Sequence, residues 1–491
     1  MDCLRKEVII VSELKQPRSS AVVAKAGLWF TVCNFMFRGL AFITTPIFAR
    51  LLTKAELGSF SNMVSWASII SVLTAFELSQ SIIRSKLEHE DDIDSYIWSI
   101  LSFSTLWTLL CYGVVCLFPS FFTSLFDMDM RFIHIMFISL LCTPAYSMLI
   151  TKHRAFYKYK TYVAITGLFI VASLALSVVL VLTMQDKLMG RVIGNYAPHI
   201  AIGGIIFVYL AIKGKRIKTE YWKYACVICI PLVPHSLSMH LLISSDRIII
   251  TQISGREYTA VYSIAYSAYH IASLIFDSMN KAFAPWLLES LHHENYTAIR
   301  KTAKIYIAVY SVLIVGVLLL APEIIWILGG KQYSGAVYCL PPLIASCVIQ
   351  LIYRMYVNIE FYKKKTIGVA IATIIAAGVN IILNLILIPL NPEHSHIIAS
   401  YTTLVGYILL LGLHYYMVKR MKLDHVYDIG YILKIILGVF IVAGAMIALY
   451  GWSPIIRYVL VVVYGAAVLY VGYRNKDKIL GLFRKKKKAK A

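Results

Sequence analysis

The sequence predicts an all-α polytopic membrane protein with about 14 transmembrane helices, in two pseudo-symmetric six-helix lobes plus two C-terminal helices. Of its 491 residues, 59% are apolar and only 15% are charged, whereas about 25% of the residues in a typical soluble domain are charged. The apolar residues form runs of roughly 20 residues, the length that a helix needs to span a bilayer. Lys and Arg gather in alternate connecting segments, as the positive-inside rule requires of cytoplasmic loops. Soluble enzymes, disordered chains, disulfide scaffolds and fibrous proteins are therefore excluded.

The predicted spans are apolar runs that end at charged residues or at Gly and Pro. The N-lobe, residues 26–212, contains six spans at 26–50, 57–84, 96–118, 132–151, 161–183 and 192–212. The C-lobe, residues 225–418, contains six spans at 225–250, 258–288, 304–328, 336–362, 366–390 and 397–418. Residues 419–474 contain two more, at 432–450 and 455–473. The polar segments are a cytoplasmic N-terminal segment (1–25), a cytoplasmic linker (213–224) and a basic cytoplasmic tail (475–491).

The distribution of Lys and Arg supports this count and places both termini in the cytoplasm. Of the 47 Lys and Arg residues, 35 fall in the termini or in the loops that an even number of spans puts inside, and only eight fall in outside loops. Omitting one span would invert every later loop and destroy this alternation. Cytoplasmic loops that meet anionic lipid then explain the net charge of +22, and a nucleic-acid partner is excluded.

A weak internal repeat accompanies the two lobes. The loop after the first span reads RLLTKAELGSFS (50–61), and the loop after the seventh span reads DRIIITQISGREYTAVYS (246–263). Both contain an Arg, an aliphatic stretch, an acid and an aromatic–Ser pair. Six-helix repeats that begin and end on the same side of the membrane are parallel, and transporters built from such repeats bind their substrate where the repeats meet. The sequence therefore predicts a transporter with its site between the lobes.

Four cations fall inside predicted spans, and they predict the path of an anion. A cation at the centre of a membrane helix costs about 2.5–3.5 kcal/mol on insertion scales, so it is usually kept where it faces a polar cavity or a counter-charge. The predicted depths differ from one cation to the next, and an Asn lies one helical turn from two of them. The candidate substrate-binding residues are Arg38, Asn34, Arg247, Lys281, Arg354 and Asn358.

Four carboxylates accompany these cations: Glu77, Asp246, Asp277 and Glu360. The proton affinity of a carboxylate in a low-dielectric site changes with the charges around it. An acid inside a membrane bundle can therefore respond to the conformation of the protein. Glu77, Asp277 and Asp246 are the candidates for coupling transport to an ion.

A structural interpretation of these acids stays open beside the functional one. Asp277 and Lys281 have i,i+4 spacing and can neutralise each other. Glu77 can pair with Arg84 two turns later, and Glu360 can reach interfacial water near the end of its span. Counter-ions of this kind stabilise a fold without taking part in transport.

Residues 26–84 resemble a known family. The first span ends in PIFARLL and is followed by TKAELGSFS and a second span. An Arg–Leu pair, a short polar turn and an acid–x–Gly step at this place are similar to those of the oligosaccharide flippases of the Wzx type. These belong to the multidrug/oligosaccharidyl-lipid/polysaccharide exporter superfamily. Many Wzx-type proteins have twelve helices, and the two additional C-terminal helices here are more similar to those of the lipid II flippases.

The resemblance implies a V-shaped pair of six-helix lobes that works by alternating access in the bacterial inner membrane. The implied substrate is an undecaprenyl-pyrophosphate-linked oligosaccharide repeat unit, moved to the outer leaflet for O-antigen, capsule or exopolysaccharide synthesis. A lipid II-type flippase and a multidrug exporter of the same superfamily remain alternatives. Expected partners are the lipid-linked oligosaccharide, membrane lipids, H+ or Na+, a polysaccharide polymerase and other assembly proteins. No cofactor is expected.

The chemistry of the residues agrees with this implication. Guanidinium groups at successive depths can replace the hydration of a pyrophosphate with charge-assisted hydrogen bonds. Tyrosines inside the spans can stack on sugar faces, although core packing or interface anchoring is expected for most of the 33 tyrosines. The tyrosines considered for stacking are Tyr262, Tyr266, Tyr269, Tyr353 and Tyr356.

A membrane glycosyltransferase or polysaccharide polymerase is the rival class. Asp92-x-Asp94 and Asp127-x-Asp129 have the acid spacing that can bind a metal nucleotide-sugar. The first pair lies in a loop of about eleven residues, and the second faces outside, where nucleotide sugars are absent. No Walker motif and no His pair with metal-site context occurs. We therefore expect no catalytic residue and no metal site, and the sequence also lacks the repeated pore loop of a channel.

Overall fold

The computed structural model describes residues 29–30, 44–452 and 454–474, and all regular secondary structure in these ranges is helical. The prediction of an all-α polytopic protein is confirmed. Two of the predicted site residues, Asn34 and Arg38, lie outside the described residues, as do the N-terminal segment and the basic tail.

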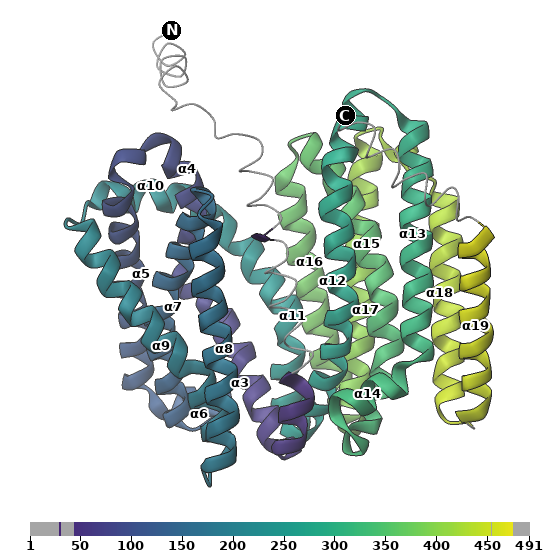
Figure 1. The fold of residues 1–491 in the computed structure, drawn as a ribbon, viewed down its shortest axis with the longest axis horizontal. Coiled ribbons are helices and arrows are strands. Elements are labelled where there is room, and N and C mark those ends of the chain that lie inside the picture. The colour runs from purple at the N-terminus through teal and green to yellow at the C-terminus, as the bar shows by residue number, and fades with distance from the viewer. Residues whose placement is uncertain (1–28, 31–43, 453, 475–491) are drawn as a thin grey trace.

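The helices form two groups side by side, with α3 and α11 between them (Figure 1). The first group contains helical residues 44–51, α3 (Lys54–Ala75), η1 (Leu78–Gln80), α4 (Ser81–Glu88), η2 (Glu90–Asp92), α5 (Ile93–Leu117), α6 (Pro119–Phe126), α7 (Met130–Ala155), α8 (Tyr159–Thr183) and α9 (Lys187–Gly214). Helix α10 (Thr219–Cys229) leads to the second group, which contains η3 (Ile230–Leu232), α11 (Val233–Ser254), α12 (Arg256–His292), α13 (Tyr296–Leu319), α14 (Ala321–Gly329), η4 (Lys331–Cys339), α15 (Leu340–Tyr362), α16 (Thr366–Leu387), η5 (Pro392–His394) and α17 (Ser395–Arg420). The chain then adds η6 (Asp424–Val426), α18 (Ile429–Tyr450) and α19 (Pro454–Arg474) at the far side of the second group.

Twelve helical stretches in the described part of the chain are long and apolar enough to cross a membrane. Helix α12 is not among these twelve, although it is 37 residues long, because tyrosines, serines and internal charges lower its hydropathy. The predicted span 26–50 is described only from residue 44. The count of fourteen spans therefore stays a prediction.

Several predicted spans are interrupted in the structure, and one of them, 304–328, divides at Leu320 into α13 and α14. The prediction of one helix over 57–84 is wrong, because α3 ends at Ala75 and both Phe76 and Glu77 adopt left-handed backbone angles, with φ of 47° and 55°. The span 225–250 is also wrong as a single helix: α10 ends at Cys229, a 3-10 turn that contains Pro231 follows, and α11 begins at Val233. The predicted linker 213–224 shortens accordingly, since α9 extends to Gly214 and α10 starts at Thr219.

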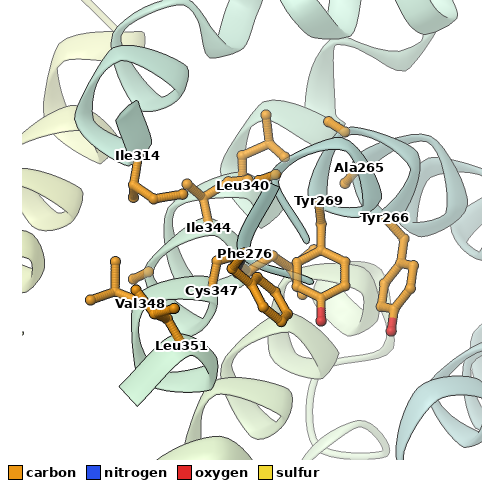
Figure 2. Packing of buried hydrophobic residues seen from close by; sticks show 14 of the residues in the cluster. Ala265, Tyr266, Tyr269, Phe276, Ile314, Leu340, Ile344, Cys347, Val348 and Leu351 are labelled. Carbon is orange, nitrogen blue, oxygen red and sulfur yellow. Dashed lines mark hydrogen bonds between the residues drawn. The ribbon is translucent and has the colours of Figure 1, made fainter. Parts of the chain in front are cut away.

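Helix α15 is the centre of the second group. Twenty of its 23 residues are buried, as expected for a helix that other helices surround on all sides. Its apolar residues Leu340, Ile344, Val348 and Leu351 pack in one cluster with residues of α12 and α13 (Figure 2). Because α15 is enclosed in this way, any polar side chain on it must face another helix or a cavity.

The two groups meet at one end of the bundle, the end that holds α6 and α14 in Figure 1. There Arg256 Nε lies 3.0 Å from Asp127 Oδ2, and Gln252 Nε2 donates to the Leu125 carbonyl at 2.8 Å. The backbone of Gly58 packs directly against the Arg256 carbonyl, where a Cβ atom would come within 1.7 Å of the oxygen. We call Gly58, Leu125, Asp127, Gln252 and Arg256 the seam.

The other hydrogen bonds between the groups lie on the same side. In the described residues, every side-chain hydrogen bond that joins 44–214 to 233–474 falls between the middle of α3 and the α14 end. Besides the seam, these bonds are Thr45–Ser267, Arg50–Ile327, Arg50–Trp326, Ser68–Ser244 and Gln332–Ala49. The structure is therefore closed at the α14 end of the bundle.

We predict that Gly58→Ala weakens the seam, because the added methyl group collides with a backbone carbonyl that cannot rotate away. Overpacking of this kind costs about 1–3 kcal/mol, so the melting temperature of the purified protein should fall. Gly113→Ala in α5 is the matched control, since its Cβ would meet nothing within 4 Å. Equal melting temperatures for the two variants in a differential scanning fluorimetry experiment would contradict this account of the seam.

Candidate functional site

A cavity of about 430 Å³ opens in the second group, between α11, α12, α15 and α17. Its polar lining comes from Tyr266, Tyr269, His270, Asp277, Gln350, Tyr353, Arg354, Tyr407, Ser267 and Ser273. Tyr266 lies about three turns along α12 from Arg256, so the seam closes the bundle on one side of this cavity. Figure 2 shows Tyr266 and Tyr269 next to each other on α12, with their hydroxyl groups pointing the same way.

Arg354 and Asp277 form an ion pair at the wall of the cavity. Arg354 Nη1 donates to Asp277 Oδ1, and the guanidinium group lies 4.7 Å from the centroid of the Phe276 ring. The two side chains are 30% and 19% exposed. The alternative that pairs Asp277 with Lys281 is wrong, because Asp277 turns toward α15 while Lys281 is exposed.

Polar pairs flank this ion pair along the α12–α15 contact. Gln350 Nε2 lies 2.7 Å from the Tyr269 hydroxyl, one turn before Arg354, and Asn358 Nδ2 donates to Asn280 Oδ1 at 2.9 Å, one turn after it. We call Gln350–Tyr269, Arg354–Asp277 and Asn358–Asn280 the polar ladder. It brings the predicted residues Arg354 and Asn358 onto one face of α15. Sequence analysis missed Gln350, although its four-residue spacing from Arg354 in an apolar span was a readable signal.

Two aromatic residues of the cavity wall stack on each other. The rings of Tyr353 and Tyr407 stack at a centroid distance of 6.2 Å. Of the tyrosines considered for sugar stacking, Tyr266, Tyr269 and Tyr353 line the cavity. Tyr262 and Tyr356 pack in the same core cluster as Tyr266 and Tyr269 but do not line the cavity.

Arg247 and Asp246 are neighbours in sequence but face different surroundings. The Arg247 guanidinium lies 4.3 Å from the centroid of the Tyr266 ring, which lines the cavity. Asp246 is completely buried, and its carboxylate accepts hydrogen bonds from Tyr262 (2.5 Å), Thr403 (2.7 Å) and Asn384 (2.6 Å). Three neutral donors thus hold this carboxylate.

Glu360 is also enclosed. It is 0% exposed, and Oε1 lies 2.7 Å from Nδ1 of the buried His414. The expectation that Glu360 reaches interfacial water is therefore wrong, because α17 covers this face of α15.

A second cavity, of about 200 Å³, lies between α3, η1, α7 and α11. We call it the Glu77 cavity, since Glu77 is the carboxylate in its lining. The suggested Glu77–Arg84 pair is wrong: Arg84 pairs with Glu88 at 2.9 Å. Glu77 lines the cavity, and its backbone is left-handed, with φ of 55°.

The acidic pairs considered for a glycosyltransferase are occupied by cations. Asp92 pairs with Lys218 and Asp94 pairs with Lys152, while Asp127 pairs with Arg256 and Asp129 pairs with Arg131. In the residues that the structure describes, no group of three or more His, Cys, Asp or Glu side chains is placed to hold a metal ion. Three of these ion pairs join distant segments of the chain, and the Asp129–Arg131 pair is local and exposed.

Comparison with solved structures shows the fold of a transporter superfamily. The lipid II flippase MurJ in an inward closed conformation matches with a TM-score of 0.69 at 15% identity, over 92% of this chain and 100% of that chain. An inward-facing multidrug resistance MATE family transporter of the MOP superfamily matches with a TM-score of 0.58 at 13% identity, over 78% and 95%. A MOP superfamily transporter from Pyrococcus furiosus matches with a TM-score of 0.52 at 14% identity, over 82% and 96%.

Sequence comparison then gives the family. Curated protein sequences provide no match. The family described as "Polysaccharide biosynthesis protein" matches residues 23–291, which is more than half of the chain. The protein therefore belongs to the polysaccharide biosynthesis protein family, in agreement with the resemblance in its sequence, and has the fold of the MOP superfamily transporters.

Proposed function

We propose that this protein is an alternating-access flippase that moves undecaprenyl-pyrophosphate-linked oligosaccharide repeat units across the bacterial inner membrane for surface polysaccharide synthesis. The observation that carries the proposal is the cavity of about 430 Å³, lined by tyrosines and by the Arg354–Asp277 pair inside an otherwise apolar group of helices. A site that binds sugars needs hydrogen-bonding groups and flat apolar faces. Charged groups inside a membrane bundle are typical of a substrate pathway.

The contacts of the seam support the proposal that the protein, in this conformation, can take substrate from the cytoplasmic leaflet. The loop charges predict that α6, α14 and Lys54 lie outside and that both termini lie inside. Closure by Arg256, Asp127 and Gly58 at the α14 end then shuts the protein toward the outside. If these contacts broke and new contacts formed at the α4 end, the same cavity would open to the other leaflet. A transporter that opens one site to each side in turn works by alternating access.

We assign the predicted cations to the charged part of the substrate. Arg354 and Arg247 flank the cavity, with Asn358 on the same face of α15 as Arg354, and Lys281 is exposed further along α12. Arg38 and Asn34 complete the proposed set. A pyrophosphate would compete with Asp277 for Arg354, because a guanidinium group binds phosphate and carboxylate oxygens in the same fork geometry.

Ion coupling is assigned to Asp277, Asp246 and Glu77, with H+ or Na+ as the coupling ion. Release of Asp277 by a phosphate that takes Arg354 would raise the affinity of the carboxylate for a cation. Substrate binding and ion binding are then linked through one side chain.

A lipid II-type flippase is the second candidate, and helices α18 and α19 favour it. A multidrug exporter also stays a candidate, because a MATE family transporter shares the fold. A membrane glycosyltransferase or polymerase has no comparable support, since the acid pairs are neutralised by Lys and Arg. The deciding experiment uses a deletion strain, in which lipid-linked oligosaccharide should accumulate on the cytoplasmic face. Accumulation of lipid II instead would establish the second candidate.

We predict that the Arg354–Asp277 pair acts in transport and not only in folding. Arg354→Gln alone should cost about 1–3 kcal/mol of stability, because the Asp277 carboxylate loses its guanidinium partner. Arg354→Gln combined with Asp277→Asn removes both charges and should restore the melting temperature, yet lower flipping in proteoliposomes at least tenfold. The surface variant Arg420→Gln is the control and should transport normally. Normal flipping by the stable double variant would show that the pair acts only in folding.

We also predict that both termini and the segment around Lys223 are cytoplasmic and that Lys331 is outside. Alkaline phosphatase fused after Lys331 should be active, whereas the same fusion after Lys223 or Ala491 should be inactive. The positive-inside rule gives the physical reason. Activity of the Lys223 or Ala491 fusion would overturn this topology and, with it, the side of the membrane to which the seam is assigned.

A further inference from the structure

The break after α3 points the Glu77 side chain into its own cavity. Phe76 and Glu77 have φ, ψ angles of 47°, 26° and 55°, 22°, two consecutive left-handed residues without a glycine. Such a conformation is unfavourable for residues with a side chain and persists where the surrounding structure imposes it, often at binding sites. Inside a membrane bundle, irregular backbone is tolerated where it is covered by protein or lines a polar cavity. The Glu77 cavity lies at this break.

A second irregularity faces the same cavity from α7. Pro144 lies inside this helix and lines the cavity together with Leu140. Proline has no backbone N–H, so the Leu140 carbonyl lacks its usual helical donor. Two neighbouring helices therefore both depart from regular hydrogen bonding at the walls of one cavity.

The hydroxyl groups of the cavity present oxygen lone pairs, not hydrogens. Ser71, Thr74, Thr143 and Ser147 line the cavity, and each hydroxyl donates its hydrogen to a backbone carbonyl of its own helix, at 2.7–3.0 Å. A hydroxyl oxygen whose hydrogen is engaged can still accept a hydrogen bond or ligate a cation. The lining is thus rich in acceptors.

The Glu77 carboxylate adds a negative charge to these oxygens. Across the described ranges of the chain, no hydrogen bond or ion pair is made to this carboxylate, whereas Asp246, Asp277 and Glu360 all have partners. We propose that the Glu77 cavity binds a monovalent metal cation, Na+ or K+, with Glu77 as the charged ligand and the hydroxyl oxygens and water as neutral ligands. Oxygen ligands suit hard cations. A single carboxylate balances one positive charge.

Both groups of helices contribute to this site. His240 of α11 lines the cavity opposite Glu77, and one turn further along α11 the Ser244 hydroxyl lies 3.1 Å from Ser68 of α3. A cation at Glu77 therefore lies where the two groups separate or approach. If the proposed alternating-access function holds, the cation favours the arrangement that binds it more tightly, because a ligand shifts a conformational equilibrium by its difference in affinity.

The test measures cation binding directly, without lipid substrate. Purified protein carrying Asp246→Asn, which removes the other buried coupling candidate, is titrated with 22Na+ in a scintillation proximity assay at constant ionic strength, with K+ as competitor. We expect saturable binding, weakened at least tenfold when Glu77→Gln is added. Glu88→Gln, a carboxylate outside the cavity, is the matched control and should bind as the Asp246→Asn protein does.

A conservative variant keeps the test decisive if Glu77→Gln does not fold. Thr143→Val retains the shape of the side chain and the charge of Glu77 but removes one oxygen, so the affinity for Na+ should fall severalfold. Equal binding with and without Glu77, or no saturable binding of Na+ or K+, would overturn the proposal, and the latter would leave Glu77 as a proton site only. Flipping by the wild-type protein is assayed separately, so loss of the proposed function and loss of the cation site give different results.

Discussion

The pairing of Arg354 with Asp277 inside the bundle is the interaction on which the organisation of the second group depends. A single charge facing lipid is unfavourable, so α15 and α12 must turn these side chains toward each other and toward a cavity. The rungs at Gln350 and Asn358 fix the rotation of α15 about its axis. With that rotation set, its remaining faces are mainly apolar apart from Glu360, which contacts His414 of α17, and α13, α17 and α18 pack around them.

The seam, in contrast to the Arg354–Asp277 pair, depends on the close approach of two backbones. Gly58 allows α3 to touch the first turn of α12, and this contact places Arg256 within reach of Asp127. Both charges are about 40% exposed, so the ion pair itself contributes little stability. A contact that combines a tight fit with a weak, water-accessible ion pair can form and separate repeatedly. The polar ladder, by contrast, lies within one group and can stay intact during such a motion.

The sequence predicts the fold class well and the partners of its charges poorly. Hydropathy and loop charge depend on single segments, so the spans at 432–450 and 455–473 agree closely with α18 and α19. The partner of Asp277 depends on which face α12 turns to α15, and nearness in sequence suggested Lys281 instead of Arg354. The break at Phe76 had no Gly or Pro signal, because the tertiary environment imposes that conformation.

The buried acids divide between the two groups in a way that bears on coupling. In the second group, Asp277, Asp246 and Glu360 are held by a guanidinium, by three neutral donors and by His414. These donors come from neighbouring helices of the same group. Glu77 belongs to the first group, while the histidine opposite it belongs to the second. If the proposed alternating access holds, relative motion of the groups changes the surroundings of Glu77. An acid whose surroundings change between two conformations is the one whose cation affinity must change with them.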